Sequence, residues 1–330
     1  MKKLVLISLA LLLCGSVRAA TLEADGLAAR LTAICASHEA KVGVTFIDLR
    51  SGREFSINGD RPFMAASVAK VPVLLAAFHL ADLGQFDLQQ QLVFHEEDKL
   101  GGSGILQWMR GGTSYTRWNL ARMMIVLSDN TATRLLVNDL SLEAVNDYLK
   151  NAGLKQTAIV DPTMLNEPPA SDLNKTTPRE MARLFAMISH QQGFSAQSKK
   201  EMISFLSNQR YRWGIWRGVP PGIKVADKTG NVDEVLNDAG IVYTKHGNYI
   251  LSVFTNGFKK QRDARLLINQ ISRAAYEEFT GEKVYDRIVK KVKRLTAKRR
   301  LSRRPFARYR RPKGRYGRLS DRRLRPAQPL

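Results

Sequence analysis

Ser67 and Lys70 are the residues of this chain whose types and spacing best suit chemistry. They lie three positions apart in a run of small and apolar residues, FMAASVAKVPVLLAAF. At that spacing two side chains share one face of a helix, and a hydroxyl near a helix N-terminus lies where developing negative charge is favoured. A lysine in apolar surroundings can lose its proton near neutral pH and act as a base. The pair predicts a serine nucleophile with a lysine base, the alternative being a chance Ser-x-x-Lys on an ordinary buried helix.

Two further polar clusters follow along the chain. Ser-Asp-Asn at 128–130 comes after an apolar run, and Lys-Thr-Gly at 228–230 ends a β-like run. Alone, the first is typical of a helix-capping turn and the second of a strand leading into a turn. Together with Ser67 and Lys70, in this order on helix, loop and strand, they match the known signature of class A β-lactamases and penicillin-binding proteins.

The chain resembles the class A β-lactamase superfamily of serine hydrolases over roughly residues 23–280. The similarity extends beyond the three motifs to further segments: Ser-Asp-Asn-Thr-Ala at 128–132, Asn-Ala-Gly-Leu at 151–154, Thr-Thr-Pro-Arg at 176–179 and GVPPGIKVADKTG at 218–230. Gly-Gly-Ser-Gly-Ile-Leu at 101–106 and Asn-Asp-Ala-Gly-Ile at 237–241 look more like the β-lactamase-related serine hydrolase branch than like drug-resistance enzymes.

This resemblance implies a role for each motif residue. Ser67 attacks the substrate carbonyl and becomes acylated, Lys70 serves as the base, and Ser128 passes a proton to the leaving nitrogen. The backbone amides of Ser67 and Asn231 are expected to bind the oxyanion. The remaining motif residues are expected to bind the substrate. Lys228 and Thr229 would bind the substrate's carboxylate, and Asn130 would bind the amide of the substrate's side chain. Gly230, in the same motif as Lys228, is also expected to be a substrate-binding residue. No cofactor is implied, and the five histidines lack metal-ligand spacing, so no metal site is predicted.

One catalytic residue of the family lacks a clear counterpart. Class A enzymes carry a glutamate in a Glu-x-x-Leu-Asn run, where it activates the deacylating water. Leu165 and Asn166 match this run, but Pro162 stands at the glutamate position, with Asp161 and Glu167 as the neighbouring carboxylates. Asp161 is kept as a candidate catalytic residue. Losing the base could add about 3–5 kcal/mol to the deacylation barrier, so slow release of the acyl group is expected.

The motifs fall in an α/β (α+β) pattern. Strand-like runs occur at 41–57 and between 223 and 254, while the middle of the chain is mainly helical. The expected architecture is β-lactamase/DD-peptidase-like: an antiparallel five-stranded sheet flanked by helices, with an inserted all-helical lobe. The hydrolase domain is predicted at 21–282, with the sheet lobe at 21–60 and 215–282 and the helical lobe at 61–214.

The two ends of the chain differ from its body. Residues 1–20 have the charged start, short apolar run and small residues of a secretory signal, so an exported, periplasmic or secreted protein is expected. Cys14 would suit a lipoprotein, but the leucine before it disfavours lipidation. Residues 283–330 hold 20 lysines and arginines against two aspartates, so they carry +18 of the net charge of +22 and leave +4 for the rest.

This Arg-rich tail is predicted to be disordered and to bind an anionic envelope polymer or lipid; nucleic acid suits an exported protein less well. A dispensable, solvated extension is the alternative. Three function classes remain open: a β-lactamase, a DD-peptidase or esterase acting on peptidoglycan-like acyl substrates, and a non-catalytic envelope-binding protein. The intact motifs argue against the third, and a monomer is expected.

Overall fold

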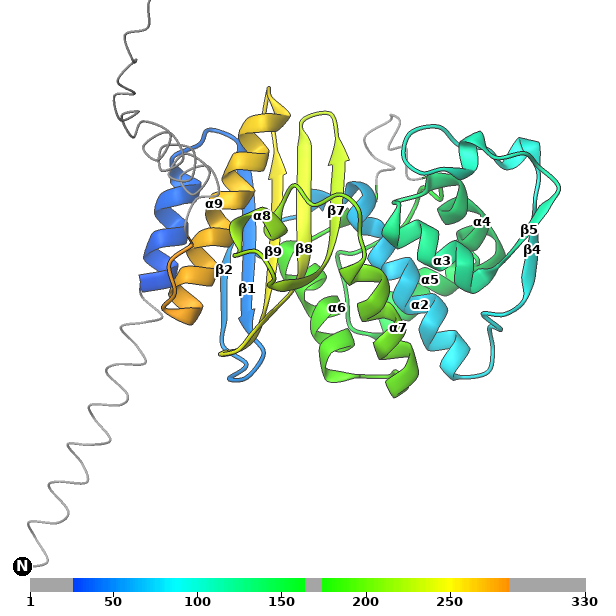
Figure 1. Ribbon diagram of the computed structural model, residues 1–330, viewed down its shortest axis with the longest axis horizontal. Helices are drawn as coiled ribbons and strands as arrows, with labels where there is room; N and C mark the ends of the chain where they lie inside the picture. The colour runs from blue at the N-terminus through cyan, green and yellow to red at the C-terminus, as the bar shows by residue number, and fades with distance from the viewer. Residues whose placement is uncertain (1–25, 164–173, 285–330) are drawn as a thin grey trace, which may run out of the picture. The chain divides into compact units, whose positions relative to one another are not determined.

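The computed structural model describes residues 26–163 and 174–284, and its centre is a five-stranded sheet (Figure 1). The strand order is β2-β1-β9-β8-β7, and every neighbouring pair is antiparallel. The strands are β1 (Lys41–Asp48), β2 (Glu54–Ile57), β7 (Lys224–Val232), β8 (Val235–Thr244) and β9 (Gly247–Asn256). The two ends of the domain thus build one sheet, as the sequence predicted.

Both faces of this sheet are buried, because apolar residues of its central strands alternate between two cores. In β9, Tyr249, Leu251 and Val253 belong to one core, and Ile250 and Phe254 belong to the other. The first face packs against the helix at 26–36, α8 (Ile215–Gly218) and α9 (Gln261–Thr280). The second faces α6 (Pro178–His190) and the helical lobe.

The helical lobe lies beside the sheet (Figure 1). Its helices are α2 (Lys70–Asp82), α3 (Arg117–Val126), α4 (Asn130–Leu140), α5 (Leu142–Asn151) and α7 (Ala196–Ser207). The segment predicted as all-helical also forms two short antiparallel pairs, β3 (Phe63–Met64) with β6 (Lys175–Thr176) and β4 (Gln91–Phe94) with β5 (Thr113–Thr116).

Helix α6 belongs to the segment predicted as the helical lobe, but it packs against β1 and β9. Its buried residues Met181, Leu184, Phe185 and Ile188 recur at helical spacing, and this apolar face covers the sheet. The sequence pattern specified the amphipathic helix but not the surface that it covers.

Helix α9 ends at Thr280, where Gly281 adopts a φ of 70°, as expected of a glycine C-cap. It begins at Gln261. Asp263 lies in the first turn, where its charge still favours the helix N-terminus.

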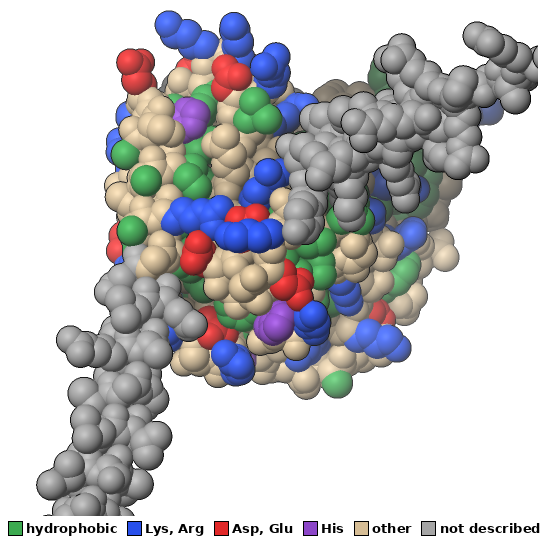
Figure 2. Space-filling view, turned by 60° about the vertical axis from the view of Figure 1, so that its left-hand side comes forward, with side chains coloured by type: hydrophobic (Ala, Val, Ile, Leu, Met, Phe, Trp, Pro, Cys, Tyr) green, Lys and Arg blue, Asp and Glu red, His purple; other side chains and the backbone are tan. Residues whose placement is uncertain are grey.

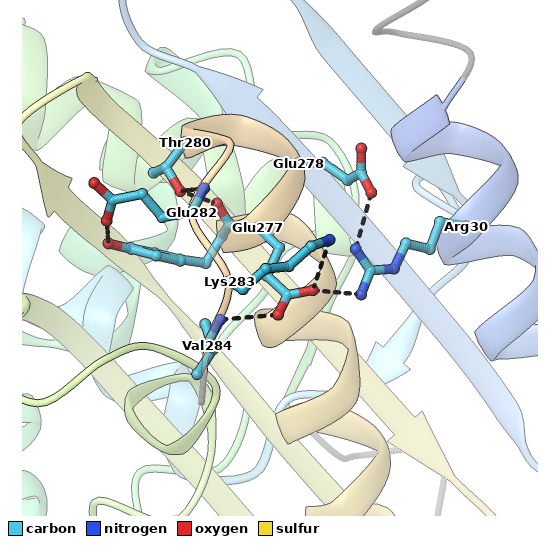
Figure 3. Close-up of polar contacts among 8 residues, drawn as sticks. Arg30, Glu277, Glu278, Thr280, Glu282, Lys283 and Val284 are labelled. Carbon is cyan, nitrogen blue, oxygen red and sulfur yellow. Dashed lines mark hydrogen bonds and ion pairs between the residues drawn. The ribbon is translucent and has the colours of Figure 1, made fainter. Parts of the chain in front are cut away.

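Glu277 joins the end of α9 to the helix at 26–36 (Figure 3). Arg30 Nη2 donates to Glu277 Oε2 at 2.7 Å, Arg30 Nη1 donates to Glu278 Oε1 at 2.8 Å, and the N–H of Val284 donates to Glu277 Oε1 at 2.9 Å. Burial acts to raise the pKa of Glu277, but the hydrogen bonds from Arg30 and Val284 outweigh it, so the pKa is lowered.

Replacing Glu277 with glutamine is expected to lower the free energy of unfolding by about 1–2 kcal/mol at pH 7. Because the folded pKa lies below the unfolded value of 4.5, this contribution is complete above about pH 4.5 and is lost as the pH falls through the folded pKa. Urea unfolding at a series of pH values measures it. Glu278→Gln, whose side chain is more exposed, serves as the control; an equal loss in both variants would contradict a special role for Glu277.

The face that presents α9 and the helix at 26–36 carries lysine and arginine side chains interspersed with aspartate and glutamate (Figure 2). This mixture agrees with the near-neutral charge calculated for the chain outside the basic tail. The predicted signal peptide and the tail from residue 285 onward lie outside the described residues. Within the described ranges, no helix is long and apolar enough to cross a membrane.

Candidate active site

Ser67 lies in a short 3-10 helix, η1 (Ala66–Ala69), directly before α2, which begins at Lys70. Ala66 adopts a φ of 47°, a left-handed conformation that costs an alanine free energy and persists only where the surroundings enforce it. Lys70 Nζ lies 3.3 Å from Ser67 Oγ and donates a hydrogen bond to it. The three-residue spacing therefore brings the predicted nucleophile and base into contact.

Strands β7 and β8 hold the η1 turn in place. Asn237 Nδ2 donates to Met64 O at 2.9 Å and Ala65 O at 3.1 Å, while Asn237 Oδ1 accepts from the N–H of Thr255 at 3.1 Å. A Cβ on Gly230 would come within 2.9 Å of Ala65 O, so β7 approaches the turn too closely for any side chain. No role for Asn237 was predicted, although an asparagine within a largely apolar strand was a usable signal.

Lys70 is fully buried and has three further acceptors around its amine. Nζ lies 2.6 Å from Ser128 O, 3.2 Å from Ser128 Oγ and 2.7 Å from Asn130 Oδ1. Burial and the positive charge of Lys228 lower the pKa of Lys70 well below its usual range, against the opposing attraction of Asp129. A lysine that loses its proton this readily can accept the proton of the Ser67 hydroxyl.

The hydroxyl of Ser128 connects two buried lysines. Lys228 Nζ lies 3.0 Å from Ser128 Oγ and also donates to Thr229 O at 2.7 Å. Burial lowers the pKa of Lys228 to about 7, against the attraction of Asp227 and Asp238. Ser128 adopts a φ of 53°, so its own backbone is strained at this position. Its hydroxyl can pass a proton between the two amines and a leaving group.

The Ser-Asp-Asn motif also anchors the preceding loop. Asp129 caps α4 and accepts the N–H groups of Ile105 at 2.6 Å and Leu106 at 2.9 Å. Asn130 Nδ2 donates to Gly101 O at 3.0 Å. Asn130 is therefore shared between Lys70 and this loop, and its predicted contact with substrate depends on the remaining amide proton.

A buried polar network beneath Lys228 was not anticipated from the sequence. Asp227 and Asp238 are both buried and lie on the neighbouring strands β7 and β8, where Asp227 Oδ2 accepts from Gln209 Nε2 at 3.0 Å and Asp238 Oδ2 accepts from the N–H of Ile215 at 2.6 Å. Burial raises the pKa of Asp227 to about 7, and burial together with the charge of Asp227 raises that of Asp238 well above its usual range. Burial therefore favours the protonated form of Asp238. Two aspartates inside otherwise apolar strands were the signal for this pair.

Asp161, the predicted deacylation candidate, takes part in a local turn. Its Oδ1 accepts the N–H of Thr163 at 2.8 Å and the Thr163 hydroxyl at 2.6 Å. Its own N–H donates to Asn174 Oδ1 at 2.9 Å. The catalytic role of Asp161 stays a prediction, as does the oxyanion role of the Asn231 amide. Glu167 lies outside the described residues.

The described residues contain no group of three or more His, Cys, Asp or Glu side chains arranged to hold a metal ion. What these residues do bring together is a set of hydroxyl and amine groups: Ser67, Lys70, Ser128 and Lys228. This arrangement can carry out acyl transfer through a serine ester.

Comparisons with known proteins agree with this chemistry. The sequence profile of the Beta-lactamase enzyme family matches residues 26–279. Beta-lactamases CARB-3 and PSE-4 of Pseudomonas aeruginosa are each 25% identical over 203 residues, 60% of this chain and 70% of the relative. The crystal structure of a beta-lactamase from Sphaerobacter thermophilus covers 79% of this chain and 99% of its own, with 31% identity and a TM-score of 0.73. A PBP-A mutant, solved as an acyl-enzyme complex with penicillin G, is also similar. The match covers 78% of this chain and 97% of PBP-A, with 28% sequence identity and a TM-score of 0.72.

Proposed function

The chain belongs to the beta-lactamase enzyme family. From this premise we propose that Ser67 is acylated by β-lactam-type or related amide and ester substrates. We further propose that the acyl group is released slowly. At the coarser level it is a serine β-lactamase-like hydrolase. The observation that carries the proposal is the contact between Ser67 Oγ and the fully buried amine of Lys70, 3.3 Å apart.

Acylation follows from this contact. Neutral Lys70 takes the proton of Ser67 as Oγ forms a bond to the substrate carbonyl carbon. Backbone N–H groups beside the η1 turn then stabilise the oxyanion. As the carbonyl re-forms, the bond to the leaving group breaks, and the leaving atom receives a proton through the Ser128 hydroxyl. The charge of Lys228 beside Ser128 favours that transfer.

Slow release is supported by the residues of the deacylation loop. Pro162 stands where the family pattern has its glutamate, and Asp161 Oδ1 already accepts two hydrogen bonds from Thr163. These two observations also favour the second candidate function, a DD-peptidase or esterase on peptidoglycan-type acyl substrates. Export and binding of an anionic envelope polymer or lipid by the tail are proposals that rest on sequence alone.

Intact-protein mass measured over time tests the proposal. The purified protein is mixed with benzylpenicillin, and in parallel with an acyl thioester, while product release is followed. We expect one adduct on Ser67 that persists for minutes, and no adduct on the Ser67→Ala variant. Sustained turnover faster than about 10 s⁻¹ without an accumulated adduct would contradict slow release. No adduct with either compound would contradict acylation.

A further inference from the structure

A groove of about 630 Å³ follows the solvent-facing side of α7, the helix that packs against β7 (Figure 1). The α7 residues that line it recur at helical spacing, so they share one face of the helix: 196, 199, 200, 203, 204 and 207. The opposite face, with Met202, Phe205 and Leu206, is buried in the core. Because α7 has 12 residues, it is about 18 Å long, and a groove along it suits an extended ligand.

Three lysines line this groove, and the protein does not neutralise them. Lys199 and Lys200 come from α7, and Lys224 is the first residue of β7. No carboxylate lines the groove, and within residues 26–163 and 174–284 none forms an ion pair with these amines. Glu201, the only carboxylate of α7, accepts a hydrogen bond from the indole of Trp118 instead. The groove therefore presents a local charge of +3, and an anionic ligand would relieve the repulsion among its amines.

Two of the three amines are held in place by neighbouring groups. Lys199 Nζ donates to Ser189 O at 2.6 Å, and Lys224 Nζ lies 4.8 Å from the ring centroid of Tyr243. An ammonium group has three N–H donors, so each amine keeps donors for a ligand. The hydroxyl of Ser204 adds a further donor, since it has no hydrogen-bond partner in the part of the chain that the structure describes.

The residue types in the groove indicate which anion it suits. The described residues that line it include no arginine, whose planar fork matches a carboxylate, whereas lysine binds phosphate as a point charge. They also include no aromatic side chain on which the bases of a single-stranded nucleic acid could stack. Lysine, serine and amide side chains together favour the phosphates of a chain that carries no bases.

We propose that the lysine groove, formed by the α7 face and Lys224, binds a linear phosphate polymer without bases, such as a chain of sugar or polyol phosphates. The groove is separate from the acyl-transfer site: Lys224 precedes Lys228 by four residues of extended strand, which is about 13 Å. A bound polymer therefore holds the protein while leaving Ser67 accessible. The groove is also separate from the basic tail, which lies outside the described residues.

Lysine acetylation of the full chain, read by peptide mass, tests the proposal residue by residue. The protein is acetylated with and without long-chain inorganic polyphosphate, which carries phosphates and no bases. We expect the polymer to slow acetylation of Lys199, Lys200 and Lys224 by about fivefold or more at concentrations well above its Kd. Lys259 and Lys260 are the matched control, because they are also neighbouring, exposed lysines without an ion pair among the described residues. Their acetylation should be unchanged.

The salt dependence of polyphosphate binding gives a second measurement. The groove variant combines three substitutions: Lys199→Gln, Lys200→Gln and Lys224→Gln. The control variant combines three at exposed lysines elsewhere: Lys155→Gln, Lys259→Gln and Lys260→Gln. Losing three ammonium–phosphate contacts should make the slope of log affinity against log salt concentration shallower by about two in the groove variant, whereas the control variant should keep the wild-type slope. Acylation of Ser67 by benzylpenicillin should be unchanged in both.

The possible outcomes separate this inference from the proposed function. Equal protection of Lys259 and Lys260, or protection of tail lysines alone, would show that net charge attracts the polymer and would overturn the groove as a site. Equal protection by poly-L-glutamate would overturn the preference for phosphate, and stronger protection by a single-stranded oligonucleotide would overturn the absence of bases. A protein that binds polyphosphate in the groove but is never acylated on Ser67 would contradict the proposed function and support this inference.

Discussion

Replacing Lys70 with methionine is expected to slow acylation of Ser67 by about 10²–10⁴-fold, the usual contribution of a positioned base. Methionine has a similar length and no amine, so it removes the base while filling the space. Stopped-flow measurement of acylation, with protein mass to identify the adduct, gives the rate. The exchange also removes the donor to Ser128 O and Asn130 Oδ1, so thermal unfolding of the variant is measured beside its rate to establish that it is folded.

The pH dependence of acylation distinguishes a base from a merely structural lysine. Lys70 acts when neutral, so the wild-type rate should rise as the pH increases through its lowered pKa. Lys228 favours proton transfer when charged, so the rate should fall again as Lys228 loses its proton near pH 7. In Lys70→Met the rising limb should disappear. A Lys70→Met variant that keeps both the wild-type rate and the rising limb would show that another group is the base. The Ser67→Ala variant, which lacks the nucleophile, gives the background rate of the assay.

The sequence was sufficient to predict which hydroxyls and amines meet. Ser67 and Lys70 are neighbours on one helical turn, so local geometry brings them together wherever the helix lies. Placing Ser128 and Lys228 beside them depended on the family resemblance, since no local rule connects residues 58 and 158 positions beyond Lys70. The five-stranded sheet was predictable from local patterns, because its strands were visible as β-rich runs at both ends of the domain.

The supporting polar residues could not be predicted in the same way. Asn237 reaches Met64 and Ala65, and Gln209 reaches Asp227, through contacts that depend on strand register and on how a loop folds back. A shift of one residue in register would send the side chain of Asn237 to the opposite face of the sheet. Polar residues within apolar strands were visible in the sequence, but their partners were not.

Replacing Pro162 with glutamate is expected to shorten the lifetime of the acyl-enzyme by about 10²–10⁴-fold while leaving acylation unchanged. The substitution restores the Glu-x-x-Leu-Asn pattern with Leu165 and Asn166, and it supplies a carboxylate that can take a proton from the deacylating water. Removing the proline costs about 1 kcal/mol or less through the added freedom of the unfolded chain. The decay of the penicilloyl adduct, followed by mass, measures the effect.

The matched control is Pro162→Gln, which has the same shape and the same loss of proline but no base. Because both variants alter the loop equally, only a difference between them reports on proton abstraction. Equal lifetimes in the two variants would show that a carboxylate at position 162 does not activate the deacylating water. A wild-type lifetime already as short as that of Pro162→Glu would mean that another group, with Asp161 as the nearest described carboxylate in sequence, activates the water. The ratio of the two variant lifetimes therefore measures what a carboxylate at position 162 contributes to deacylation.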